Sequence, residues 1–223
     1  DWQEPLWVAV YPIAGDATAS TRDYIDQLDV ATFGPIERFL AEQARAHGKR
    51  VTRPSRIALG PRLSEAPPVP PEDGSLLSVM AWSLRLRYWA WTHQSDALLS
   101  DISLFVIFHD PTRTPRVPHS LGLKEGGIGV VHAFAVNDMT QSNNVVMTHE
   151  LLHTVGATDK YDPATDQPWH PHGFAEPRRQ PPYPQQHAEI MGGMIPVAPD
   201  RATIPRSLDQ VVVGAATAAE IGW

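Results

Sequence analysis

The chain has 223 residues, 42% of them apolar, and a formal net charge of −7. This content is enough to bury a core in one domain or a two-lobed one, and the excess of acidic residues argues against nucleic acid as a partner. No apolar run reaches the roughly 18 residues of a transmembrane helix, so we expect no membrane segment. The chain contains no cysteine, so disulfides cannot stabilise it.

The first half of the chain predicts alternating strands and helices. Apolar periodicity indicates, in order, a strand over 6–11, an amphipathic helix over 21–47 that Pro35 could divide, a strand over 56–60, a helix over 75–93, a buried strand over 102–108, and one or two strands over 126–136. In the second helix, apolar side chains at helical spacing predict a buried face: Trp82, Leu84, Leu86, Tyr88, Trp89 and Trp91. We therefore expect an α/β (α+β) fold, a twisted mixed sheet backed by helices.

The composition changes after residue 156. Residues 157–205 are rich in proline and show no helical or strand periodicity, which predicts irregular structure. A short closing helix is expected over 217–223. We predict one domain with two lobes, residues 1–156 and residues 157–223.

The segment from His149 to His153 has the pattern H-E-x-x-H. On a helix, two histidines four residues apart point the same way and can bind one zinc ion from a single rigid element. Glu150, beside the first histidine, is then placed to act on a zinc-bound water. The apolar residues around the motif favour a helix, with three N-cap candidates at Ser142, Asn143 and Asn144.

Gly156 and Asp159 extend the pattern to H-E-x-x-H-x-x-G-x-x-D. A catalytic zinc requires a third protein ligand. If the helix stops at Gly156, the chain can turn and bring Asp159 back to the metal. The rival third ligands are Glu176, which lies among prolines where no regular helix forms, and Glu189. We therefore predict Asp159 as the third ligand.

This extended motif resembles the signature of the metzincin clan of zinc metallopeptidases. Its aspartate is most similar to that of the snapalysin type, which are small secreted bacterial proteases. The resemblance covers residues 143–159 and 188–194. It implies a two-lobed catalytic domain in which the zinc helix lies above an irregular C-terminal lobe. It also implies a turn that places a methionine side chain beneath the zinc.

Met191, followed by Gly192 and Gly193, fits that methionine turn best, and Met194 is the second candidate. Several metzincins carry a tyrosine where this chain has Gly193. Help in stabilising an oxyanion would then have to come from other side chains. The candidates for oxyanion or substrate contact are Tyr161, Tyr183 and His132.

These features predict a zinc-dependent endopeptidase. One Zn²⁺ would be held by His149, His153 and Asp159, and Glu150 would act as general base on a zinc-activated water. The resemblance implies that a protein or peptide substrate pairs with the strand over 126–136. Two alternatives stay open: a zinc-binding module without catalysis, and a zinc hydrolase acting on a non-peptide substrate.

Two further expectations concern metal content and location. His170 and His172 form a Trp-His-Pro-His cluster that leaves a second metal open. Because the sequence begins at Asp1 without methionine, we expect a processed protein that is secreted or periplasmic.

Overall fold

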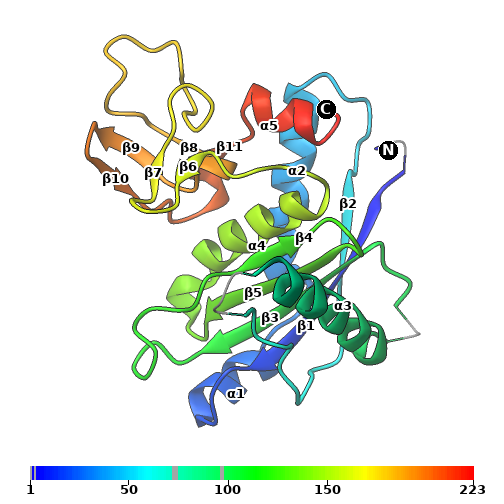
Figure 1. Cartoon of the computed structure of the whole chain (residues 1–223). Coiled ribbons are helices and arrows are strands. Elements are labelled where there is room, and N and C mark those ends of the chain that lie inside the picture. Colours follow the sequence, from blue (N-terminus) through cyan, green and yellow to red (C-terminus); the bar gives the residue numbers. More distant parts are fainter. Residues whose placement is uncertain (1, 3, 72–74, 96–97) are drawn as a thin grey trace.

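A five-stranded sheet forms the centre of the molecule in the computed structural model, which describes residues 2, 4–71, 75–95 and 98–223. The strands are β1 (Leu6–Ala14), β2 (Ser55–Leu59), β3 (Ile102–His109), β4 (Leu121–Leu123) and β5 (Ile128–Phe134). Their order is β2-β1-β3-β5-β4, and only the edge strand β4 runs antiparallel to its neighbour. The predicted mixed α/β fold is confirmed (Figure 1).

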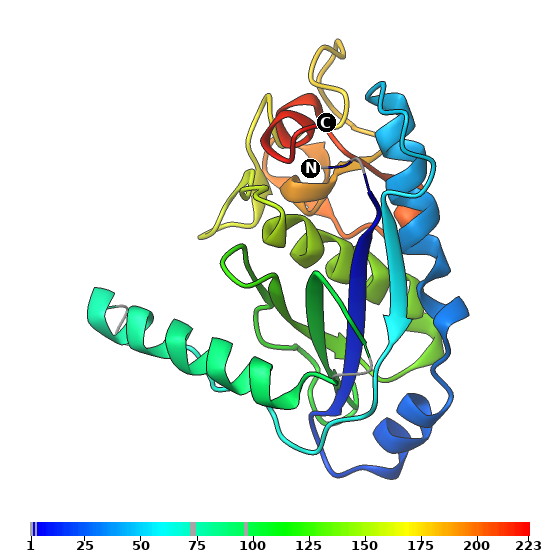
Figure 2. The ribbon, with the colours of Figure 1, turned by 90° about the vertical axis from the view of Figure 1, so that its right-hand side faces the viewer.

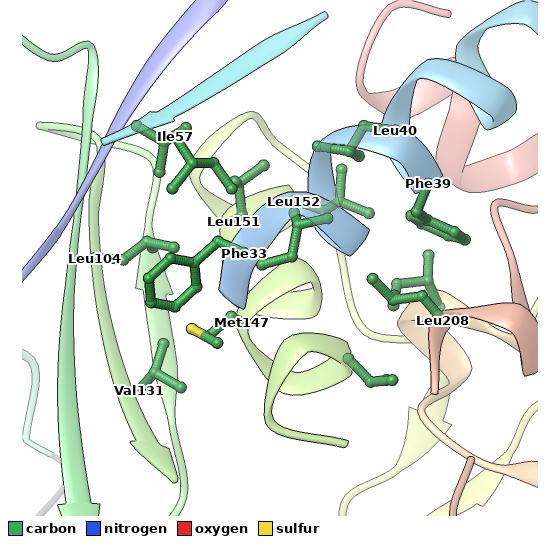
Figure 3. Close-up of a cluster of buried hydrophobic side chains, with 14 of the residues drawn as sticks. Phe33, Phe39, Leu40, Ile57, Leu104, Val131, Met147, Leu151, Leu152 and Leu208 are labelled. Carbon is green, nitrogen blue, oxygen red and sulfur yellow. The ribbon is translucent and has the colours of Figure 1, made fainter. Parts of the chain in front are cut away.

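Helices cover both faces of this sheet. On one face lie α1 (Ala19–Asp26), α2 (Gly34–Ala46) and α4 (Thr140–Thr154), and on the other lies α3 (Leu76–His93). The interior β3 is buried along its whole length, as expected for a strand covered on both faces. Figure 3 shows the core beside α4, where Phe33, Leu104 and Val131 surround Met147, Leu151 and Leu152. Burying each such side chain contributes about 1.5–3 kcal/mol to the stability of the fold, so apolar packing fixes the position of α4.

The helix predicted over 21–47 is divided into three pieces. After α1, Asp29 caps a 3-10 turn, η1 (Val30–Phe33), by accepting a hydrogen bond from the Thr32 amide. Pro35 then stands in the first turn of α2, where its missing N–H costs nothing. The proline therefore begins a helix and does not interrupt one.

The predicted buried face of α3 is confirmed only in part. Leu86 is fully buried, as is Ala90, and Trp82 and Trp89 pack half-buried against the same cluster. Leu84, Tyr88 and Trp91 are instead 63%, 67% and 71% exposed. The helix touches the sheet along a narrow stripe and extends away from it, as Figure 2 shows. Because α3 is apolar on all sides, its periodicity could not indicate which side meets the sheet.

The chain after Gly156 forms only short elements. They are β6 (Tyr161–Asp162), β7 (Gln167–Pro168), β8 (Ala188–Glu189), η3 (Ile190–Gly192), β9 (Ile195–Ala198), β10 (Arg201–Thr203), η4 (Leu208–Gln210), β11 (Val211–Val212) and α5 (Ala215–Glu220). The last helix begins two residues earlier than predicted and ends before Ile221. Buried residues of this part, among them Met191, Leu208 and Ile221, belong to the same apolar cluster as α4.

At the carboxyl ends of β1 and β3, Asp16 joins two strands. Its carboxylate accepts hydrogen bonds from the amides of Asp110 (2.7 Å) and Thr18 (3.0 Å) and from the Thr18 hydroxyl (2.6 Å). Burial would raise the pKa of Asp16, but these hydrogen bonds outweigh it and hold the pKa well below its ordinary value. The ionised carboxylate therefore stabilises the folded state.

We expect Asp16→Asn to lower the free energy of unfolding by about 1–3 kcal/mol at pH 7. Because the folded pKa is depressed, this stabilisation is complete above the ordinary value near 3.9 and is lost as pH falls through the folded pKa. Urea unfolding at pH 7 and at about pH 3 checks this, with a smaller difference expected in acid. Asp26→Asn, which removes an exposed ion pair with Arg62, is the control. Equal losses of unfolding free energy at both pH values would contradict a stabilising role for the ionised Asp16 carboxylate.

Candidate metal centre

Helix α4 presents its two histidines on the side opposite its buried apolar side chains. Leu151 and Leu152 are fully buried against the core, while His149 and His153 stand one turn apart with ring centroids 4.7 Å apart. The helix begins at Thr140, so the predicted caps at residues 142–144 are wrong. Asn143 instead bonds the backbone of Phe134 through both its amide atoms, which fastens α4 to β5.

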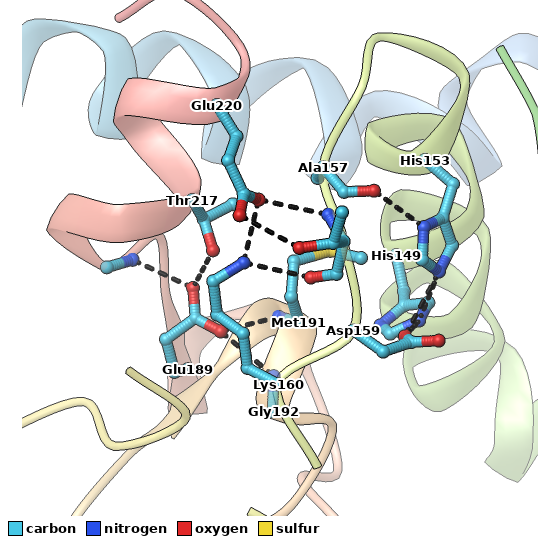
Figure 4. A network of polar contacts seen from close by, with 12 residues as sticks. His149, His153, Ala157, Asp159, Lys160, Glu189, Met191, Gly192, Thr217 and Glu220 are labelled. Atoms are coloured by element: carbon cyan, nitrogen blue, oxygen red, sulfur yellow. Dashed lines mark hydrogen bonds and ion pairs between the residues drawn. The ribbon is translucent and has the colours of Figure 1, made fainter. Parts of the chain in front are cut away.

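The turn after α4 brings the third predicted ligand back to the histidines. The helix ends at Thr154, and Gly156 has φ +108°, a conformation that favours glycine. Three residues later, Asp159 Oδ1 lies 3.1 Å from Nε2 of His149 and 3.1 Å from Nε2 of His153. The two Nε2 atoms are also 3.1 Å apart. The structure thus brings together all three predicted ligands, shown in Figure 4.

Each histidine is oriented by a backbone carbonyl on the far side of its ring. Nδ1 of His149 lies 2.9 Å from the Ile190 oxygen, and Nδ1 of His153 lies 2.8 Å from the Ala157 oxygen. A carbonyl can only accept, so Nδ1 carries the proton and donates. When the ring is neutral, the lone pair on each Nε2 is therefore available to a metal, an arrangement typical of metal-binding histidines. Without a metal, a protonated ring can instead donate from Nε2 to Asp159.

These three residues form a group that can hold a metal ion, with donor atoms all within 4.8 Å of one another. On a tetrahedral zinc with bonds of about 2.0–2.1 Å, ligand atoms are about 3.3 Å apart. The observed separations of 3.1 Å are close to that value. Two imidazoles and a carboxylate are also a donor set that zinc accepts.

The charges of the group are strongly coupled. Burial alone would lower the pKa of His149, but the hydrogen bonds with Asp159 and the Ile190 carbonyl and the negative charges of Glu150 and Asp159 together outweigh it and raise that pKa. Burial would likewise raise the pKa of Asp159, and the hydrogen bonds from His149 and His153 instead hold it well below its ordinary value. A negative carboxylate facing two imidazoles is the electrostatic arrangement that attracts a cation.

Glu150 is a buried carboxylate beside the metal group. It is 5% exposed, and its Oε2 has no hydrogen-bond partner. Burial raises the pKa of this carboxyl. An unpaired buried carboxylate oxygen costs stability, so its presence next to three side chains that could hold a metal ion points to a functional role.

The edge strand β4 lies directly against α4 at this point. A Cβ on Gly122 would come within 2.5 Å of the Glu150 carbonyl oxygen and 2.6 Å of His153 Cβ. Only glycine allows this approach. The strand predicted over 126–136 as the substrate edge is in fact the interior strand β5 (Ile128–Phe134), covered by β4. Sequence reasoning missed β4 because its three residues are too short to show alternation.

A recess of about 320 Å³ opens beside His149. Its walls are mostly apolar, from Val145, Val146, Ile190, Met194 and Ile204, with Tyr161, Asp166 and His119 also lining it. Met194, the second candidate for the methionine turn, lines this recess. Met191 is instead completely buried, and its carbonyl accepts a hydrogen bond from the Lys160 amide at 2.8 Å. The adjoining Ile190 is the residue that orients His149.

The predicted oxyanion or substrate residues lie in three different places. Tyr161 is near the metal group, with its ring centroid 6.4 Å from that of His149, and burial with the neighbouring carboxylates raises its pKa to about 12. Tyr183 packs on Phe174. His132 lies on the sheet face opposite α4, where its Nδ1 is 2.9 Å from Nε2 of His109. Burial, followed by the proximity of His109, lowers the pKa of His132 to about 4.

The rival ligands do not reach the group. Glu176 accepts hydrogen bonds from Arg179 and the Gln186 amide, and Glu189 accepts four hydrogen bonds within its own surroundings. His170 lies against Phe174 and the Pro177 carbonyl, and His172 is exposed. Within the described part of the chain, neither histidine belongs to a group of three or more metal-binding side chains.

Sequence reasoning missed the polar residues that surround Asp159. Lys160 is buried, and its ammonium group lies 2.7 Å from the Glu220 carboxylate on α5. Glu189 joins the turn at Met191 to Thr217 of the same helix. Lys160 and Glu220 are 60 residues apart in the chain, and Glu189 and Thr217 are 28 apart. No local pattern could therefore have revealed these contacts.

Comparison with protein-family models and with curated proteins gives no match for this chain. Among solved structures, the fold is similar to the crystal structure of wild-type OgpA from Akkermansia muciniphila, with a TM-score of 0.46 and 13% sequence identity. The similarity covers 97% of this chain and 60% of that one, so this chain spans less than two thirds of that protein. Among the described residues, no helix is long and apolar enough to cross a membrane.

Proposed function

We propose that this chain is a zinc-dependent endopeptidase of the metzincin type. The observation that carries the proposal is the triangle of His149, His153 and Asp159 donor atoms beside the buried, unpaired carboxylate of Glu150. A purely structural zinc site has four protein ligands and no use for such a carboxylate. When bound, zinc supplies Lewis acidity, polarising a carbonyl and lowering the pKa of water toward about 7.

The chain's own residues then carry the proton transfers. Glu150 accepts the proton of the attacking water and passes it to the leaving nitrogen of the scissile bond. Its raised pKa suits both steps, because such a carboxyl takes up a proton more readily than an exposed one. Tyr161 keeps its proton at neutral pH, since its pKa is about 12. It can therefore donate a hydrogen bond to the substrate oxygen.

The surroundings favour an extended peptide as the substrate. β4 is an edge strand lying against α4 beside Glu150 and His153, and a peptide backbone can add to such an edge as a further strand. The apolar recess next to His149 is suited to one apolar side chain near the bond that is cut. Protein or peptide is accordingly the proposed substrate class.

Digestion of casein and of a mixed peptide library tests this function. We expect cleavage by the zinc-loaded protein, loss of cleavage with a chelator, and recovery on adding zinc. Mass spectrometry of the peptides would show whether cuts occur beside apolar residues. Stoichiometric zinc without cleavage of any peptide would contradict the proposal and favour a zinc-binding module or a hydrolase of another substrate.

A further inference from the structure

Asp159 lies in an irregular loop and needs external support to face the histidines. Its side chain is 44% exposed, and it stands between α4 and β6, outside any regular element. Ordering a loop side chain costs conformational entropy. A ligand held in place before the metal binds therefore binds more tightly than a mobile one.

Both neighbours of Asp159 are fastened to α5, sixty residues later in the chain. The Glu220 carboxylate accepts hydrogen bonds from the Thr158 amide (2.9 Å) and the Thr158 hydroxyl (2.8 Å). The Lys160 ammonium group donates to Glu220 (2.7 Å) and to the Thr158 carbonyl (2.9 Å). Figure 4 shows this ring of contacts on the side of the loop away from the histidines.

The same helix also supports the turn beneath the loop. Thr217 donates to Glu189 Oε1 (2.6 Å), as does the Gly214 amide (3.0 Å). The other oxygen of Glu189 accepts from the amides of Met191 and Gly192 at 2.8 and 2.9 Å. The Lys160 amide then donates to the Met191 carbonyl at 2.8 Å, which joins the two supported segments.

Charge makes these contacts strong. The Lys160 side chain is only 5% exposed and that of Glu220 is 32% exposed. Charge-assisted hydrogen bonds in such surroundings are shorter and stronger than neutral ones. A buried ammonium without its carboxylate is unfavourable, so the pair holds Thr158 and Lys160 in one arrangement, with Asp159 between them facing the two histidines.

We propose that Lys160 and Glu220 are positioning residues that hold Asp159 in place as the third metal ligand, with α5 as their support. The inference rests on the metal site of the proposed function and not on its peptidase activity. It gives the C-terminal helix a part in metal binding although no residue of that helix contacts the metal group.

Zinc affinity of Lys160→Met and Glu220→Gln, measured by competition with a chromophoric chelator, tests the proposal. Both variants are expected to weaken zinc binding about 10–100-fold, the usual effect of losing a residue that orients a ligand. In both variants the visible absorption spectrum of the Co²⁺-loaded protein is also expected to change, because the geometry of the ligands around the metal changes. This spectrum separates a displaced ligand from a general loss of stability.

Leu86→Ala is the matched control. Leu86 of α3 is completely buried in the apolar cluster on the other face of the sheet, so its truncation destabilises the fold without disturbing α5 or any contact to Thr158 or Lys160. The control is expected to lower the melting temperature of the metal-free protein while keeping the zinc affinity and the Co²⁺ spectrum of the wild type. Wild-type affinity in Lys160→Met and Glu220→Gln would overturn the proposal, as would an equal loss of affinity in Leu86→Ala. A wild type that binds zinc but cleaves no peptide would refute only the peptidase, and the affinity comparison would still decide.

Discussion

Replacing Glu150 by glutamine is expected to slow peptide hydrolysis by about 10²–10⁴-fold, the usual contribution of general acid–base catalysis. Glutamine keeps the shape of the side chain but cannot take up a proton at neutral pH. The zinc content is expected to stay the same, because Glu150 is not one of the three residues whose donor atoms meet. Single-turnover hydrolysis of a defined peptide, together with metal analysis of the purified variant, makes the measurement.

The same substitution has an expected effect on stability that serves as an internal check. Burial raises the pKa of Glu150, so at pH values above that pKa the ionised carboxylate opposes folding. The metal-free glutamine variant should therefore melt at a higher temperature than the metal-free wild type. Glu176→Gln, which alters a carboxylate bonded to Arg179, is the control and should keep full activity. A fully active Glu150→Gln would refute the assigned role.

Removing the metal is expected to lower the melting temperature. A ligand at 1,000 times its dissociation constant stabilises the folded state by about 4 kcal/mol. For a chain of this size that corresponds to roughly 8–16 °C. Thermal unfolding with a chelator and with added zinc measures the shift. The absence of any shift would mean that the donor group does not bind zinc.

Asp159→Asn should make this zinc-induced shift smaller. The amide keeps an oxygen but loses the negative charge that faces both imidazoles. If the affinity falls about 100-fold, about 2.7 kcal/mol of the zinc-dependent stabilisation is lost. Asp138→Asn makes the same change of charge at an exposed position in η2 (Asn137–Met139) and should leave the shift unaltered. Each variant is compared with its own metal-free form, because Asp159 also contacts the histidines without metal.

The metal group was the part of this protein most open to prediction from sequence. His149 and His153 share a face because four residues make about one helical turn, and this follows from backbone geometry alone. Gly156 then ends the helix, and Asp159 follows within three residues. The three predicted ligands can therefore be named from eleven consecutive residues, although the contacts that support Asp159 come from Glu220, far along the chain.

Tertiary packing determines which residues surround the group of His149, His153 and Asp159. The need for glycine at position 122 becomes clear only from the close packing of β4 against α4. Which side of α3 is exposed depends on how that helix packs on the sheet. His132 faces away from α4 because of the pleat of β5, not because of any feature of the residue itself.

The sequence by itself determined the helix, its end and the grouping of the three predicted ligands, since each depends on interactions between residues close in the chain. Only the tertiary structure decided what holds those ligands. Glu220 meets Lys160 and Thr158, and Thr217 meets Glu189, across long stretches of irregular chain. Such contacts form only when the complete fold brings distant residues together, so no periodic pattern in the sequence reveals them.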